Sequence, residues 1–187
     1  MTALRIVCFG SSRIHPGEAA YEQAQRVGRV LAERKLSVLT GGYGGAMEAI
    51  SRGSHKAGGR VLGVTTTIFT ARTANPHLHE EFVETDYVSR MATLLRQGHG
   101  YLGLPGGLGT LSEWVTAWCL ATIQQLPGPL WLFEDPWRPV VDALQQVPEI
   151  ASAHLGHLRW VHDADDFARQ LDGWIGARAE SPDSPVV

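Results

Sequence analysis

The chain is poor in the residues that several classes of enzyme depend on. Among its 187 residues there are only two cysteines and two lysines. Lys35 and Lys56 both fall where a helix is expected to end, so a Schiff-base enzyme that uses pyridoxal phosphate is poorly supported. Cys8 and Cys119 lie far apart in the sequence and have no metal-type spacing. We therefore expect both to be small core residues, with neither a disulfide nor a nucleophilic role.

Long hydrophobic runs and an excess of charge of one sign are also missing. No apolar run approaches the roughly 18–20 residues that a membrane span needs, so no membrane partner is expected. The formal charge of −3 gives no reason to expect binding to nucleic acid. The first residues run almost at once into a strand-like segment, so we expect no signal peptide and a cytoplasmic location.

Short apolar runs alternate with segments of helical periodicity along the whole chain. The runs predict strands over 5–10, 36–40, 61–64, 82–84, 101–104, 130–133 and 158–161. The periodic segments predict helices over 18–34, 46–56, 87–97, 111–125, 136–146 and 164–175. This alternation predicts an α/β, Rossmann-like fold, with a parallel sheet covered by helices on both faces.

The same pattern sets the expected domain organisation. With no internal repeat and no linker, we expect one nucleotide-binding domain over residues 1–176. The tail, 177–187, has little apolar content and is expected to be disordered. Residues 65–81 are polar and irregular, typical of either a lid or an ordered surface loop.

Three loops rich in glycine or serine follow the first, second and fifth predicted strands. Ligands of such sheets bind beyond the carboxyl ends of the strands, so these loops are candidates for contact with phosphate or ribose. The candidates are Gly10, Ser11, Ser12, Gly42, Gly44, Gly45, Pro105, Gly106, Gly107, Gly109 and Thr110. Each loop also has a simpler interpretation: the serines could cap or turn the chain, and the glycines could serve close packing or a tight turn.

Two familiar nucleotide motifs are absent. The first strand is followed by Gly-Ser-Ser-Arg, which lacks G-x-G-x-x-G, and the second ends in Thr40-Gly41, where an acidic residue for a ribose diol is expected. A nicotinamide dinucleotide cofactor is therefore disfavoured. No glycine turn is followed by Lys-Ser or Lys-Thr, which argues against a P-loop. We expect no cofactor.

The most informative segment runs from a buried strand through Pro105-Gly106-Gly107 into a helix. A helix N-terminus offers free backbone N–H groups and a positive dipole end, which suit a phosphate. The carboxylate of Glu113 is unexpected near such a site, because it carries the same sign of charge as a phosphate. Thr110 and Glu113 have the spacing of a capping box, so from this segment alone Glu113 could be a cap, a catalytic carboxylate or both.

Two other groups of residues favour structural interpretations. His77 and His79, with the glutamates that follow them, are expected in a solvated loop, and His154 and His157 have no metal-like partner spacing, so no metal site is expected. Trp114 and Trp118 share one stripe, which we interpret as core or a subunit interface.

The segment Pro105-Gly106-Gly107-Leu108-Gly109-Thr110-Leu111-Ser112-Glu113 resembles the PGGxGTxxE motif of the LOG (LONELY GUY) family, formerly labelled "possible lysine decarboxylase". The resemblance covers roughly residues 4–175, including the serine loop and the second glycine loop. Arg90 stands where the family's Met-x-x-Arg-Lys segment carries its arginine. Met91 replaces the lysine of that segment, which indicates a divergent branch.

The resemblance implies a phosphoribohydrolase that cleaves the N-glycosidic bond of a nucleoside 5′-monophosphate into free base and ribose 5-phosphate. Arg90 and Glu113 would be its catalytic pair. AMP or another purine nucleotide is the expected substrate class, with cytokinin-type nucleotides included. The alternative is a non-catalytic nucleotide or molybdenum-cofactor carrier of the same superfamily. Family members commonly form homodimers, and the stripe bearing Trp114 and Trp118 favours one here.

Overall fold

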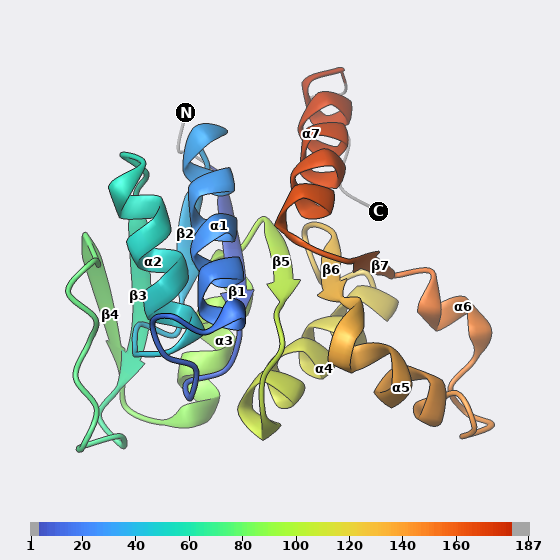
Figure 1. The fold of residues 1–187 in the computed structure, drawn as a ribbon. Coiled ribbons are helices and arrows are strands. Elements are labelled where there is room, and N and C mark those ends of the chain that lie inside the picture. Colours follow the sequence, from blue (N-terminus) through green and yellow to red (C-terminus); the bar gives the residue numbers. More distant parts are fainter. Residues whose placement is uncertain (1–3, 181–187) are drawn as a thin grey trace.

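The structure, a computed structural model, describes residues 4–180, which form a seven-stranded, fully parallel sheet. Its order is β4-β3-β2-β1-β5-β6-β7 (Figure 1). The strands are β1 (Arg5–Phe9), β2 (Ser37–Thr40), β3 (Val61–Thr66), β4 (Glu80–Glu84), β5 (Gly100–Gly103), β6 (Leu130–Phe133) and β7 (Leu158–Val161). Most are short and completely buried, as expected of a parallel sheet covered on both faces.

Helices connect the strands. They are α1 (Ala19–Glu33), α2 (Ala46–Lys56), α3 (Tyr87–Gln97), α4 (Leu108–Thr122), α5 (Glu134–Leu144), α6 (Ser152–Leu155) and α7 (Ala164–Glu180). Helix α1 contacts both α2 and α7, and α1 and α2 lie in front of the strands in Figure 1. Helices α3 and α4 contact β1 from the other face. The expectation of a single Rossmann-like α/β fold is confirmed.

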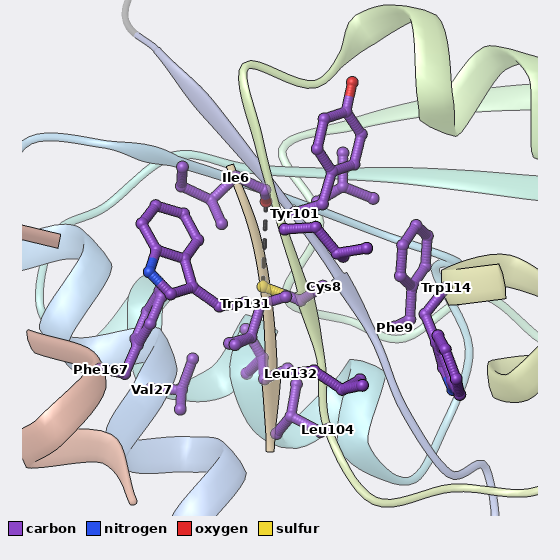
Figure 2. Close-up of a cluster of buried hydrophobic side chains, with 14 of the residues drawn as sticks. Ile6, Cys8, Phe9, Val27, Tyr101, Leu104, Trp114, Trp131, Leu132 and Phe167 are labelled. Carbon is purple, nitrogen blue, oxygen red and sulfur yellow. Dashed lines mark hydrogen bonds between the residues drawn. The ribbon is translucent and has the colours of Figure 1, made fainter. Parts of the chain in front are cut away.

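Large aromatic side chains fill the core on both faces of the sheet. In Figure 2, Trp131 and Phe167 lie to one side of the central strands, and Phe9 and Trp114 lie to the other. Trp131 packs edge-on against Phe167, with 5.3 Å between ring centroids, and Trp114 packs against Trp137 at 5.4 Å. Such pairs add stability beyond the area they bury. The first pair joins β6 to α7, and the second joins α4 to α5.

The C-terminal prediction needs correction. Residues 177–180, expected in a disordered tail, form the last turn of α7, and residues 181–187 lie outside the described part of the chain. Alanine, arginine and glutamate are strong helix formers, so a segment with no apolar face can still extend a helix that is already formed. The guanidinium of Arg178 also lies over the ring of Trp174, 5.4 Å from its centroid. The short helix α6 was not predicted.

The predictions for Cys119 and for the tryptophan stripe also need correction. Cys8 is buried as predicted, but Cys119 is exposed on α4. Trp114 and Trp118 are both buried within the single chain, and the Trp118 indole N–H donates to the carbonyl oxygen of His154 on α6 at 2.8 Å. The stripe is therefore core, and it no longer supports a subunit interface. Over residues 4–180, no helix combines the length and apolar composition needed to cross a bilayer.

Candidate active site

The three predicted loops meet at the carboxyl ends of β2, β1 and β5, which are neighbours in the sheet. From β1 the chain passes first to β2 on one side and later to β5 on the other, so strand order reverses here. The backbone N–H of Ser11 donates to the carbonyl oxygen of Pro105 at 3.1 Å, and the N–H of Ala46 donates to that of Ser11 at 2.7 Å. The serine loop is thus hydrogen-bonded to both glycine loops.

Close packing explains two of the glycines directly. Gly45 has a φ of +71°, and a Cβ there would overlap the backbone of Ser11 and Ser12. Gly42 has a φ of +77°, and a Cβ there would lie 2.8 Å from the side chain of Thr65. Only glycine adopts these positive φ values without strain. Both residues bring the second glycine loop against its neighbours.

The loops enclose a cavity of about 360 Å³. The predicted residues that line it are Gly10, Ser11, Ser12, Arg90, Gly107, Gly109, Thr110 and Glu113. Gly44 lines an adjoining cavity of about 370 Å³ together with Ser12, Arg13, Tyr43, Arg72 and Thr73. Gly42, Gly45, Pro105 and Gly106 are not among the residues that line either cavity.

The capping-box interpretation of Glu113 is wrong. Helix α4 begins at Leu108 with Gly107 as its extended N-cap, and no side chain caps it. Thr110 is then the third helical residue and Glu113 the sixth, in the second turn. An α-helix rises 1.5 Å per residue, so the Cα of Glu113 lies about 7.5 Å along the axis from that of Leu108. Glu113 therefore belongs to the turn that follows the free N–H groups of the first turn.

Arg90 is held rigidly beside this carboxylate. It lies one turn into α3, whose N-cap Asp86 accepts a hydrogen bond from the backbone N–H of Ser89 at 2.9 Å. The side chain of Arg90 is only 5% exposed. Its Nε–H donates to the carbonyl oxygen of Val64 at 2.7 Å, and its Nη2 donates to that of Gly41 at 3.0 Å.

The remaining terminal nitrogen of Arg90, Nη1, lies 3.4 Å from Oε1 of Glu113. Glu113 is itself only 9% exposed. Burial raises the pKa of Glu113 to about 7, even though the nearby charge of Arg90 acts to lower it. The carboxyl group can thus exchange a proton near neutral pH, as general acid–base chemistry requires.

Six other residues that line the main cavity were not predicted as site residues, namely Arg13, Met47, Phe69, Arg72, Tyr87 and Leu108. Phe69 and Arg72 belong to the predicted irregular segment. Asn75 anchors that segment: its backbone N–H donates to the carbonyl oxygen of Gly42 at 2.9 Å, and its Nδ2 donates to that of Tyr43 at 3.2 Å. Its ends belong to β3 and β4, and the residues between Thr66 and Glu80 form an anchored surface loop. In the sequence, an aromatic residue and an arginine in the loop after a buried strand could have identified Phe69 and Arg72 as site residues.

The histidines are placed in structural contacts. Nδ1 of His79 accepts a hydrogen bond from the backbone N–H of Val61 at 3.2 Å, and the ring of His55 lies 5.1 Å from that of His79. Glu80 and Glu81, expected with them in a solvated loop, begin strand β4. Within residues 4–180, no group of three histidine, cysteine or acidic side chains could hold a metal ion.

Comparison with known proteins places the chain in a family. The family model described as "Possible lysine decarboxylase" matches residues 47–171, more than half of the chain. The chain belongs to the LOG family. One LOG-family relative, the cytokinin riboside 5′-monophosphate phosphoribohydrolase of Rhodococcoides fascians, is 31% identical over 127 residues, which are 65% of this chain and 64% of that protein.

A second relative is larger. The pyrimidine/purine nucleotide 5′-monophosphate nucleosidase of Escherichia coli K12 is 34% identical over 116 residues, 58% of this chain and 25% of that protein. The chain thus spans about a quarter of one relative and just under two thirds of the other.

Solved structures share the LOG-family fold. The molybdenum cofactor binding protein of Rippkaea orientalis has a TM-score of 0.74 at 22% identity, covering 94% of this chain and 99% of that one. The Moco carrier protein of Chlamydomonas rheinhardtii has the same TM-score at 18% identity, with the same coverage.

Proposed function

We propose that this LOG-family protein hydrolyses the N-glycosidic bond of a purine nucleoside 5′-monophosphate, with cytokinin-type nucleotides in the same class. The observation that carries the proposal is the buried Arg90–Glu113 pair in a cavity walled on one side by a helix N-terminus. The names of the relatives, a nucleosidase and a phosphoribohydrolase, support the same reaction class.

The substrate's 5′-phosphate binds at the first turn of α4. The N–H groups of Leu108, Gly109 and Thr110 have no acceptor inside the helix, and the dipole favours an anion there. The backbone of Ser11 is hydrogen-bonded into the same corner, and Ser11 and Ser12 add hydroxyl groups for the phosphate or the ribose.

The reaction takes place beside Glu113. The C1′–N bond breaks, its electron pair leaves with the base, and a water oxygen bonds to C1′. The ribose becomes oxocarbenium-like in this transition state, so a carboxylate stabilises it and accepts a proton from the attacking water. That proton balances the one taken up by the departing base, and the products are free base and ribose 5-phosphate.

Arg90 positions the carboxylate. Two of its nitrogens are used by backbone carbonyl groups, so its guanidinium cannot swing away from Glu113. Its charge also favours the ionised form of the carboxyl group at neutral pH. Met91, where family members carry lysine, packs against the hydrophobic core and adds no charge to the site.

Product analysis tests the proposal. Purified protein is incubated with AMP, GMP, IMP and CMP, and free base and ribose 5-phosphate are quantified by chromatography. Release of base from a purine monophosphate, with none from the corresponding nucleoside, is the expected result because the phosphate site is part of the cavity. No release from any monophosphate, together with tight binding of a nucleotide or pterin, would favour the carrier function.

We also propose a cytoplasmic homodimer. Two exposed apolar side chains support the homodimer in place of the tryptophan stripe. Val88 at the start of α3 is 72% exposed, and Leu108 at the start of α4 is 80% exposed. Apolar side chains exposed at neighbouring helix ends are typical of surfaces that bury against a partner. Light scattering coupled to gel filtration should give twice the 20.4 kDa chain mass, and a monomer at all concentrations would contradict this.

A further inference from the structure

The loop after β3 places an arginine on an aromatic ring, and both residues line the cavity. The guanidinium carbon of Arg72 lies 4.5 Å from the ring centroid of Phe69 and 5.7 Å from that of Tyr43. The two rings meet edge to face at 5.8 Å. Within residues 4–180 no carboxylate lies within 4 Å of the Arg72 side chain, so its in-plane N–H donors are available to a ligand.

This arginine lies across the cavity from the N-terminus of α4. Strand β3 and strand β5 are separated by β2 and β1, and adjacent strands lie about 4.8 Å apart, so their ends are about 14 Å apart. Arg90 donates to the carbonyl oxygen of Gly41, which follows β2, and contacts Glu113, so this pair lies between the two walls. With the phosphate at α4 and C1′ beside Glu113, the base extends toward Phe69 and Arg72.

The chemistry of this wall favours one kind of base. Phe69 and Arg72 line the cavity here, and Arg13 lines the adjoining cavity together with Arg72. Both arginines are donors only, and the phenyl ring offers no strong acceptor. A 6-oxopurine presents two acceptors, O6 and N7, to which an arginine donates bidentately, whereas adenine presents a donor at position 6.

We infer that Phe69 and Arg72 form a nucleobase subsite that selects 6-oxopurines, guanine and hypoxanthine, over adenine. The ring of Phe69 supports the guanidinium of Arg72, which donates to O6 and N7 of the base. The inference rests on the proposed function and specifies its substrate class.

Steady-state kinetics with IMP, GMP and AMP test it. For the wild-type protein kcat/KM should be about tenfold or more higher for IMP and GMP than for AMP, the scale of one bidentate contact. Arg72→Gln should lower kcat/KM for IMP by about tenfold or more and turn the preference toward AMP, because a glutamine amide can pair with adenine. Arg96→Gln, on the exposed end of α3, is the matched control and should change neither.

Ribose 5-phosphate separates base recognition from phosphate binding. It carries the phosphate but no base, so Arg72→Gln should leave its inhibition constant unchanged. Weaker inhibition in the variant would place Arg72 on the phosphate and overturn the inference, as would a wild-type preference for AMP. If the protein hydrolyses no nucleotide, the proposed function fails, and the dissociation constants of IMP and AMP, measured by calorimetry on both proteins, decide the inference instead.

Discussion

Replacing Glu113 by glutamine isolates the charge of the buried carboxyl group. The substitution keeps the size of the side chain and an oxygen that can accept from Nη1 of Arg90, 3.4 Å away. Because α4 is capped by Gly107, the substitution removes no helix cap. The variant differs from the wild type in charge and basicity at one position.

The expected loss of activity is large. An amide can neither stabilise an oxocarbenium-like ribose nor take a proton from water, so kcat should fall about 100-fold or more, about 2.7 kcal/mol of transition-state stabilisation. Nucleotide binding should persist or tighten, because a negative charge near the bound phosphate is removed. Wild-type turnover by a folded Glu113→Gln protein would refute the catalytic role.

The same variant reports on the pKa of Glu113 through stability. Folding raises this pKa from 4.5 to about 7, so the folded state holds the proton more tightly than the unfolded state. The resulting stabilisation is complete below pH 4.5 and is lost as the pH rises through about 7. It amounts to about 3 kcal/mol in the free energy of unfolding.

Urea unfolding of both proteins between pH 4.5 and 8.5 measures this difference. The wild type should lose stability relative to Glu113→Gln as the pH rises across this range. Parallel curves for the two proteins would mean that burial does not shift the pKa of Glu113.

Three further outcomes are expected. In the wild-type protein kcat/KM should fall as the pH drops below about 7, because protonation of Glu113 removes the carboxylate, and a profile flat from pH 5 to 8 would contradict this. Arg90→Met leaves a buried carboxylate and two backbone carbonyl oxygens without their donor. It should therefore lower the free energy of unfolding by about 3 kcal/mol or more in chemical denaturation. A loss under about 1 kcal/mol would show that water replaces the guanidinium. Gly45→Ala should lower Tm by several degrees, because its positive φ is strained for alanine and the added Cβ overlaps the serine loop. Gly44→Ala is the control: a Cβ there meets nothing within 4 Å, so Tm should be nearly unchanged. Equal effects of the two substitutions would argue against strain at Gly45.

Much of the fold could be read from local pattern. Buried parallel strands are short apolar runs and the helices between them repeat at 3.6 residues, so segments such as 130–133 and 87–97 were predicted with their observed bounds. Parallel strands also place their carboxyl ends at one edge of the sheet. The meeting of the three loops at that edge therefore followed from the sequence.

The function of individual side chains depended on tertiary contacts. The capping-box spacing of Thr110 and Glu113 suited a helix that starts at the threonine, but the backbone at Gly107 starts it three residues earlier. Arg90 has the pattern of a helix surface residue, and only the approach of the carbonyl groups of Val64 and Gly41 makes it buried.

Arg72 lies 41 residues from Glu113 in the sequence, and no local periodicity relates them. They share a cavity because the sheet brings the ends of β3 and β5 within reach of one ligand. The sequence by itself determined the strands and helices and the edge of the sheet where the three loops meet. The tertiary structure alone decided which charges are buried together there, because burial and pKa depend on groups distant in the chain.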